Sequence, residues 1–405
     1  MQGTTEPSSE VELATARPVL RGHVFVPPLL AVAVLANSAM VPLMPYLLAT
    51  RSGWPLWQVG LHSFAVTGTT ILLNRRAARL IDRGTSPTLL CALGGLAQVG
   101  AGVAAAGALG HSALLVLVVP LLAAGGATVP VFYAMGRRAA DRAGADAARY
   151  NSVLRVATSA GWMVGPAASF AVLGGVSPAP ALLATSAVAL LGVAALIAAR
   201  RPLRSQPTVA TAPAGGNDED LNKAGRRAMR SATGVVLVLS FAHIVTTSSL
   251  ALLLVEHTGI PESGTGLVLG VKASVEIVAI LLAPTLQRRL GLRRTLIACA
   301  VVAMLAYSVY LVAHGWVPAL AGAALEGAYY GAFAGVALTW VQSLAPERVG
   351  HTTGAYMTGI YTGVLLGSPV SGAIATLWLP GITMASILAA AAVLLLLPRG
   401  TRPVS

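Results

Sequence analysis

The chain has 405 residues, of which 56% are hydrophobic and only 10% charged, and its formal net charge is +13. A soluble domain carries about 25% charged residues, so this composition excludes an ordinary soluble protein and predicts an all-α membrane protein. The apolar runs are long and continuous, without period-2 alternation, which favours helices over a β-barrel.

The apolar runs predict twelve transmembrane helices in two sets of six. The first set is expected at 24–49, 57–74, 88–109, 112–136, 151–173 and 179–199, and the second at 232–256, 264–286, 295–313, 317–343, 352–377 and 380–398. We therefore expect a cytoplasmic tail (1–22), an N-terminal six-helix bundle (23–199), a cytoplasmic linker (200–231), a C-terminal six-helix bundle (232–398) and a second cytoplasmic tail (399–405).

The positive charge is spread over alternate loops. Clusters of Arg follow the second, fourth and eighth spans, whereas the loops after spans three, five, seven, nine and eleven contain no Lys or Arg. This is the pattern of the positive-inside rule, so both termini are predicted to be cytoplasmic in a multi-pass protein of the inner (plasma) membrane. The same spread argues against a nucleic-acid partner.

Signatures of cofactor or metal chemistry are missing from the sequence. Cys91 and Cys299 both lie within apolar runs, which argues against a disulfide framework or a zinc site. The chain contains no G-x-x-x-x-G-K-[ST], H-E-x-x-H or G-x-S-x-G motif. We therefore expect no cofactor and no metal, and we exclude ATP-driven transport by this chain alone.

The two halves repeat a pattern of small residues. Gly161, Gly165 and Pro166 in the fifth span correspond to Gly363, Gly367 and Pro369 in the eleventh. Such spacing lets helices approach closely, and it can arise by chance among 43 glycines. Its recurrence in equivalent spans indicates duplicated bundles, as in monomeric transporters whose halves move around a site at the membrane midplane.

This layout resembles the major facilitator superfamily, and several segments resemble its bacterial sugar efflux transporters. They are "NSVLRVATSAGWMVGP" (151–166), "GVKASVEIVAILLAPTLQRRLGLRR" (270–294) and "VQSLAPERVGHTTGAYM" (341–357). The resemblance implies proton-linked export of sugars, glycosides or related molecules. Of the superfamily's loop signature, "ARLIDRGTSP" keeps Asp82 and Arg83 but lacks the basic pair, which weakens arguments about gating by that loop.

Lys272 and Glu276 are the most unusual residues, because both lie in the middle of the eighth span. They are four residues apart and share one face of the helix. Each charge costs roughly 2.5–3.5 kcal/mol at the centre of a bilayer. They form either a neutralising structural pair or a proton-coupling pair, in which Glu276 binds the proton and Lys272 adjusts its affinity. The resemblance includes Glu276 and favours the second interpretation.

Six further polar or aromatic residues in the spans could carry function, each with a structural alternative. Glu326 is a second proton or substrate contact, or a hydrated acid near the outer mouth. His243, Tyr329 and Asn37 line the cavity or pack within their bundle. Arg155 faces the cavity or extends to the headgroups, and Trp162, seven residues further on, stacks on a sugar or packs.

We therefore predict a secondary active transporter that exports a small hydrophilic molecule by proton antiport and alternating access. A sugar, a glycoside, an aminated sugar or a drug would fit the few charged residues of the spans. Multidrug or antibiotic export and proton-coupled import by the same fold remain open. A membrane-embedded transferase would need converging catalytic groups and a long loop, and the outer loops here are short.

Overall fold

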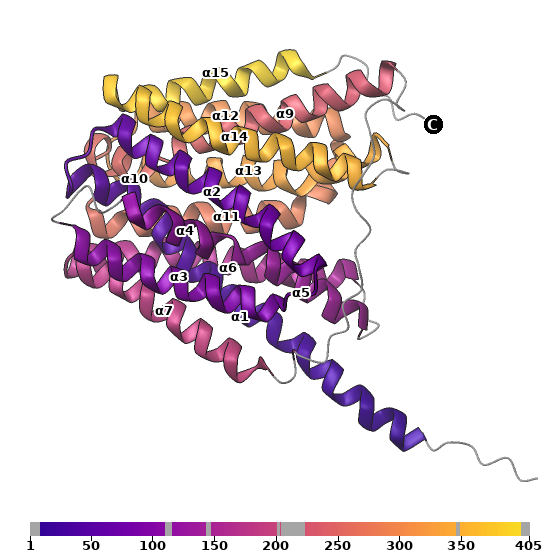
Figure 1. The fold of residues 1–405 in the computed structure, drawn as a ribbon. Coiled ribbons are helices and arrows are strands. Elements are labelled where there is room, and N and C mark those ends of the chain that lie inside the picture. The colour runs from indigo at the N-terminus through magenta and orange to yellow at the C-terminus, as the bar shows by residue number, and fades with distance from the viewer. Residues whose placement is uncertain are drawn as a thin grey trace, which may run out of the picture.

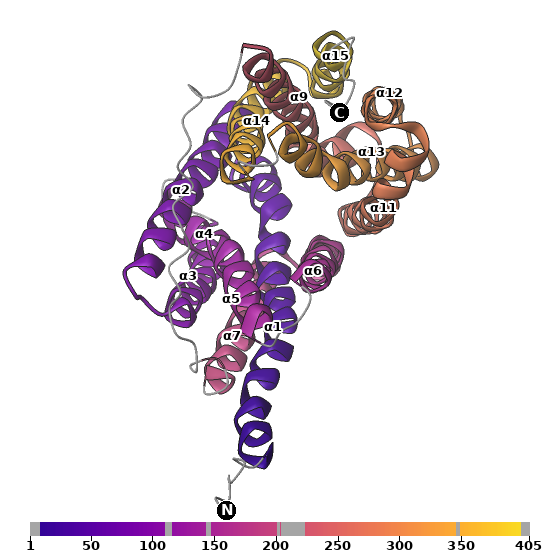
Figure 2. The same cartoon turned by 90° about the vertical axis from the view of Figure 1, so that its right-hand side faces the viewer.

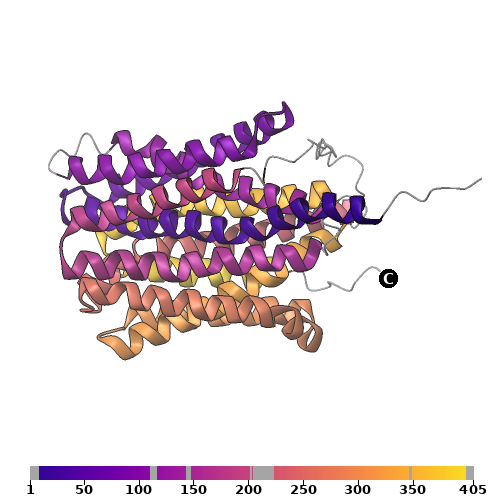
Figure 3. The same ribbon diagram turned by 90° about the horizontal axis from the view of Figure 1, so that it is seen from below.

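The computed structural model describes residues 9–109, 116–142, 147–200, 203, 223–345 and 349–397. Within those residues the chain forms helices and no strand. The helices run side by side along one common direction, as Figure 1 and the view from below in Figure 3 both show. The predicted all-α fold is confirmed.

The helices cover most of the apolar runs, and several continue into polar segments, as α1 does from Ser9 and α9 from Lys223. The first half contains α1 (Ser9–Thr50), α2 (Leu56–Asp82), α3 (Pro87–Ala108), α4 (Val118–Gly126), α5 (Thr128–Arg142), α6 (Ala147–Gly175) and α7 (Pro178–Ala198). The second half contains α9 (Lys223–Thr247), α10 (Leu250–Leu252), η3 (Leu253–His257), α11 (Glu262–Leu290), α12 (Leu292–Leu311), α13 (Trp316–Ser343), α14 (Val349–Leu377) and α15 (Gly381–Leu396).

Local signals set several of these ends. Pro87 and Pro178 occupy the first positions of α3 and α7, where the missing backbone N–H is not needed. Gly291 alone separates α11 from α12, with a φ of 78° that side chains other than glycine rarely adopt. The chain therefore reverses within a single residue at the basic end of α11.

Among the described residues, nine helices are long and apolar enough to cross a membrane. α2 and α13 are long enough but too polar to reach the same hydropathy, and α15 has only 16 residues. The chain is thus a multi-pass membrane protein, while twelve spans with cytoplasmic termini stay a prediction. Most of the predicted linker (201–202 and 204–222) and the last residues (398–405) lie outside the described part.

The helices gather into two groups that correspond to the two halves of the sequence. Figure 2, which looks along the helices, shows α2 beside α14 and α6 beside α11, and these neighbours join the groups. At the first seam, a Cβ added to Gly60 would lie 2.7 Å from the carbonyl oxygen of Ser368 and 3.1 Å from the Cα of Gly372. Backbone therefore meets backbone between α2 and α14.

The second seam is built in the same way between α6 and α11. A Cβ on Gly266 would lie 2.6 Å from the carbonyl oxygen of Ala167, and one on Gly174 would lie 2.6 Å from the backbone nitrogen of Ser263. By the predicted topology, both seams lie toward the extracellular ends of their helices. The halves are thus packed together at that end of the molecule.

A polar latch links the halves at the same end. Arg51 Nη2, just after α1, donates to both carboxylate oxygens of Glu262, the first residue of α11, at 2.8 and 2.9 Å. The Tyr46 hydroxyl donates to Glu262 Oε1 at 2.7 Å. Because the Arg51 and Glu262 side chains are 44% and 25% exposed, solvent screens this pair.

We expect Glu262→Gln to loosen the latch and to favour separation of the extracellular ends. A partly exposed ion pair contributes roughly 0.5–1 kcal/mol, so the population packed at this end should fall about two- to fivefold. Distances between spin labels at the exposed residues Val176 and Val312 would measure the shift. In the native protein, high salt should lengthen the same distances as the variant does. Tyr46→Phe should have a smaller effect. An unchanged distance distribution in Glu262→Gln would contradict a role for the latch.

Candidate functional site

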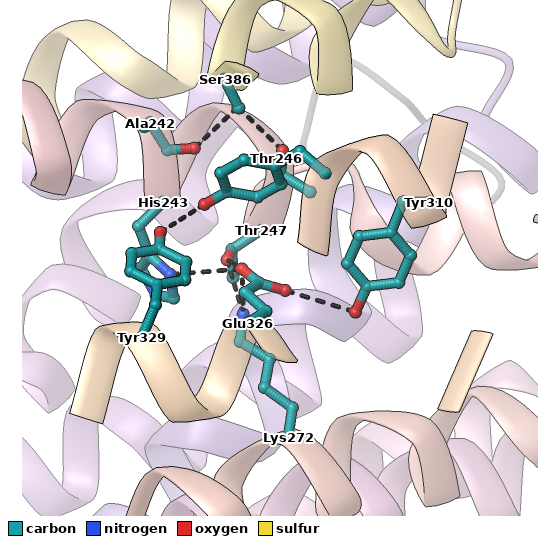
Figure 4. A network of polar contacts seen from close by, with 10 residues as sticks. Ala242, His243, Thr246, Thr247, Lys272, Tyr310, Glu326, Tyr329 and Ser386 are labelled. Carbon is teal, nitrogen blue, oxygen red and sulfur yellow. Dashed lines mark hydrogen bonds and ion pairs between the residues drawn. The ribbon is translucent and has the colours of Figure 1, made fainter. Parts of the chain in front are cut away.

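A buried ion pair lies inside the second half. Lys272 Nζ of α11 donates to Glu326 Oε1 of α13 at 2.8 Å (Figure 4). The Glu326 side chain is completely buried and that of Lys272 is 7% exposed. Two opposite charges at this depth are tolerated because each compensates the other.

Neighbouring helices complete the hydrogen bonds of this pair. Thr247 of α9 accepts from Lys272 Nζ at 2.7 Å and donates to Glu326 Oε1 at 3.1 Å. Tyr310 of α12 donates to Glu326 Oε2 at 3.3 Å, and His243 Nδ1 lies 3.2 Å from Oε1 without the alignment of a hydrogen bond. Four helices thus converge on one carboxylate, and we call Lys272, Glu326, Thr247, Tyr310 and His243 the buried charge network.

Aromatic rings enclose one side of the buried charge network. The His243 ring stacks on Tyr330 with centroids 3.6 Å apart and lies edge-on to Tyr329. The Tyr329 hydroxyl hydrogen-bonds to that of Tyr307 on α12, and both side chains are buried. His243 and Tyr329 therefore lie within the second half in this conformation, among groups that shield the ion pair from water.

Lys272 and Glu276 form no direct ion pair, because the direct partner of Lys272 is Glu326. The two residues still interact electrostatically, so a coupling role for them stays a prediction. Residues four apart share a helix face, but side chains on a neighbouring helix can approach more closely than one on the same helix. On α13, Gly327 and Gly331 face the backbone carbonyls of Lys272 and Glu276, where any side chain would collide with them. Because α13 comes so close, the Glu326 carboxylate reaches the Lys272 ammonium.

Glu276 is left in a different situation from Glu326. Among the described residues, its carboxylate has no hydrogen-bond or ion-pair partner, and its side chain is partly exposed. It is near enough to Tyr330 for electrostatic interaction, and Tyr330 interacts in the same way with Tyr356 of α14. Glu276 is thus an accessible acid within a membrane helix, beside the buried charge network.

Arg155 of α6 lies across from these groups on the first half. Its side chain is exposed, and it interacts electrostatically with Tyr133 of α5 and with Tyr356 of the second half. Tyr133 also hydrogen-bonds to Thr158, one turn along α6, at 2.9 Å. Arg155 therefore faces the space between the halves, and Tyr356 is a common neighbour of Arg155 and Tyr330.

Trp162 and Asn37 lie elsewhere on the first half. Trp162 is exposed and stands seven residues after Arg155, on the same side of α6. Asn37 Nδ2 lies 3.5 Å from the position that a Cβ on Gly126 would take, with the Thr70 side chain beside it. Asn37 thus points toward α2 and α4 inside its own bundle, away from the buried charge network.

The small residues that repeat between the halves occupy equivalent helix contacts. Gly161 and Gly165 pack against Val34, Leu35 and Ser38 of α1, and Gly363 and Gly367 pack against Leu237, Phe241 and Ile244 of α9. Pro166 and Pro369 lie inside α6 and α14. Each half therefore packs its fifth span against its first, α6 against α1 and α14 against α9.

The remaining loop residues give little information. Arg83 caps the C-terminal end of α2 and is exposed. The Asp82 side chain lies outside the described residues. In the part of the chain that the structure describes, no cluster of three His, Cys, Asp or Glu side chains could hold a metal ion.

Several residues of this region escaped the sequence interpretation. Tyr307 and Tyr310 are three apart on one face of an otherwise apolar helix, a signal that could have identified them. Thr247 follows His243 by four residues and shares its helix face, but its contacts with Lys272 and Glu326 depend on how the helices pack. Tyr133 and Tyr356 carried no pattern, because only the packing of α5, α6 and α14 brings them near Arg155.

Comparison with known proteins agrees with this architecture. Residues 232–405 match the Major Facilitator Superfamily. The nucleoside transporter NupG has a similar structure, with a TM-score of 0.73 at 13% identity, covering 93% of this chain and 97% of NupG. A bacterial homologue of the iron transporter ferroportin in an inward-facing state gives a TM-score of 0.70 at 17% identity, covering 93% and 98%. The chain is a membrane transporter with the major facilitator fold.

Its sequence relatives are more specific. The chain is 27% identical to sugar efflux transporter A of Dickeya chrysanthemi over 85% of its own length and 86% of that protein. It is 28% identical to sugar efflux transporter B of Salmonella typhimurium, over 79% and 81%. The predicted resemblance to the major facilitator superfamily and its sugar efflux transporters is confirmed. The chain is therefore a transporter and not an enzyme, so the transferase alternative is set aside.

Proposed function

We propose that this transporter exports a sugar, a glycoside or an aminated sugar across the plasma membrane in exchange for protons. The relatives named as sugar efflux transporters support this class of substrate. Hydroxyl groups of Tyr133, Tyr330 and Tyr356 and the guanidinium of Arg155 suit a solute rich in oxygen atoms. Alternating access would then open and close the seams at the extracellular end.

The observation that carries proton coupling is the contrast between two intramembrane acids. Glu326 is fully buried and compensated by Lys272, Thr247 and Tyr310. Among the described residues Glu276 has no hydrogen-bond or ion-pair partner, and it interacts with Lys272 and Glu326 only electrostatically. An isolated carboxylate within a membrane span is expensive unless it binds a cation or a proton. We assign proton binding to Glu276, with Lys272 and Glu326 as a charged pair next to it.

The test is transport by purified protein in proteoliposomes. Under an imposed pH gradient, radiolabelled lactose or a methyl glycoside should move against its gradient, and a protonophore should abolish this. Glu276→Gln should lower gradient-driven transport at least tenfold, corresponding to about 1.4 kcal/mol, yet retain exchange of labelled for unlabelled substrate. Exchange needs no net proton movement.

Glu256→Gln is the matched control, because Glu256 is an exposed acid of η3, outside α11 and remote in sequence from its middle. It should transport like the native protein. Full gradient-driven transport by Glu276→Gln would remove Glu276 from the coupling mechanism. Glycoside transport that ignores the protonophore would rule out antiport, and import alone under either gradient direction would assign the chain to the importers.

A further inference from the structure

A cavity of about 430 Å³ lies at the predicted cytoplasmic end of the first half, remote from the buried charge network. The start of α3, the end of α7 and the end of α5 surround it. Its lining includes Ser86 and Thr88 from α3, Arg138 from α5, and Ile197 and Arg200 from the end of α7. No step of the proposed transport uses these residues.

The cavity is positively charged. Arg138 and Arg200 both line it, and no hydrogen bond or ion pair joins either guanidinium to the described part of the chain. None of the residues found to line it is acidic. The hydroxyls of Ser86 and Thr88 and the positive end of the α3 dipole add further favourable interactions for an anion. Two guanidiniums that line one cavity are suited to binding a phosphate group.

The surface next to the cavity is apolar. Leu89, in the lining, and Leu93 and Leu96 further along α3 are exposed large hydrophobic residues. Ile197, also in the lining, and Leu190 are exposed on α7, which packs beside α3. A cationic cavity at the membrane surface, continued by apolar helix faces, matches an amphiphile with an anionic head and hydrocarbon chains.

We propose that this cavity binds the phosphate head group of an anionic phospholipid from the cytoplasmic leaflet. Arg138 and Arg200 hold the phosphate, and the acyl chains lie along the exposed faces of α3 and α7. A soluble phosphate would share the same chemistry at the head group but would gain nothing from the leucines. The inference does not depend on which substrate is transported or on proton coupling.

Lipid binding to the purified full chain tests the proposal without any transport measurement. Native mass spectrometry would titrate the protein in detergent with phosphatidylglycerol, with phosphatidylcholine of the same chains, and with inorganic phosphate. We expect phosphatidylglycerol to bind about tenfold more tightly than phosphatidylcholine. The double variant Arg138→Gln/Arg200→Gln should lose that preference, since it removes both guanidiniums that line the cavity and that would contact the phosphate directly.

The control variant Arg289→Gln/Arg293→Gln removes the same charge from exposed positions in the second half and should bind like the native chain. Equal thermal unfolding of all three proteins in phosphatidylcholine would establish that the variants are folded. Equal preference for phosphatidylglycerol in the double variant and the control would overturn the site. If inorganic phosphate bound as tightly as the lipid, the cavity would be a site for soluble phosphate, and the proposal of a lipid ligand would be wrong.

Discussion

Glu326→Gln should reduce the free energy of unfolding by about 3–5 kcal/mol and abolish gradient-driven transport, because it leaves the Lys272 ammonium buried without its counter-charge. The Glu326 carboxylate accepts from Lys272, Thr247 and Tyr310, so its loss also disturbs contacts on three other helices. Unfolding in mixed micelles and transport in proteoliposomes measure the two effects separately. Tyr310→Phe removes a single donor to the carboxylate and should cost less, about 1.5–3 kcal/mol.

The double variant Lys272→Met/Glu326→Gln separates stability from coupling. With both charges of the pair removed, neither side chain leaves a buried ion without its partner, and stability should return to within roughly 1–2 kcal/mol of the native protein. Transport driven by the pH gradient should stay lost if the pair takes part in coupling. Restored transport in the double variant would make the pair purely structural, and stability that stays as low as in Glu326→Gln would show that packing, not charge, dominates.

Gly60→Leu should hold the extracellular seam between α2 and α14 open. A side chain at this position collides with the backbone at Ser368, Pro369 and Gly372, and backbone cannot move aside as a flexible side chain can. Overpacking of this kind typically costs 1–3 kcal/mol, so the population packed at the extracellular end should fall by a factor of roughly 5 to 150. Spin-label distances between Val176 and Val312 should lengthen, and transport should slow accordingly.

Gly107→Leu provides the matched control for this substitution. Gly107 lies near the predicted extracellular end of α3, and a Cβ there would meet nothing within 4 Å. The control should leave the distances and the transport rate unchanged. If Gly60→Leu behaved like Gly107→Leu, the α2–α14 seam would have no part in the conformational change.

The sequence was sufficient for the fold class but only partly for the site. Hydropathy and loop charge predict membrane helices because a bilayer forces each span to be long and apolar. Small residues at Gly161 and Gly363 indicated close helix contacts, since glycine has few other uses inside an apolar helix. These are local properties of one segment, which a single sequence records directly.

The partner of Lys272 could not be predicted in this way. Glu326 is 54 residues further along the chain. It reaches Lys272 because Gly327 and Gly331 carry no side chain where α13 packs against the backbone of α11. Helical periodicity relates residues within one helix and contains nothing about which helices touch. The sequence therefore leads to Lys272 and Glu276 as two charges on one helix face, while the carboxylate in direct contact with Lys272 comes from another helix.

The glycine seams also bear on how fast the protein can change shape. Interlocked side chains must change rotamers before two helices can separate, whereas the backbone surfaces of Gly60 and Gly372 can part without such rearrangement. The seam itself therefore adds little to the activation barrier. Of the contacts described at this end, the Arg51–Glu262 latch is the one that salt screens, so we expect the helices to separate faster at high ionic strength on the predicted extracellular side.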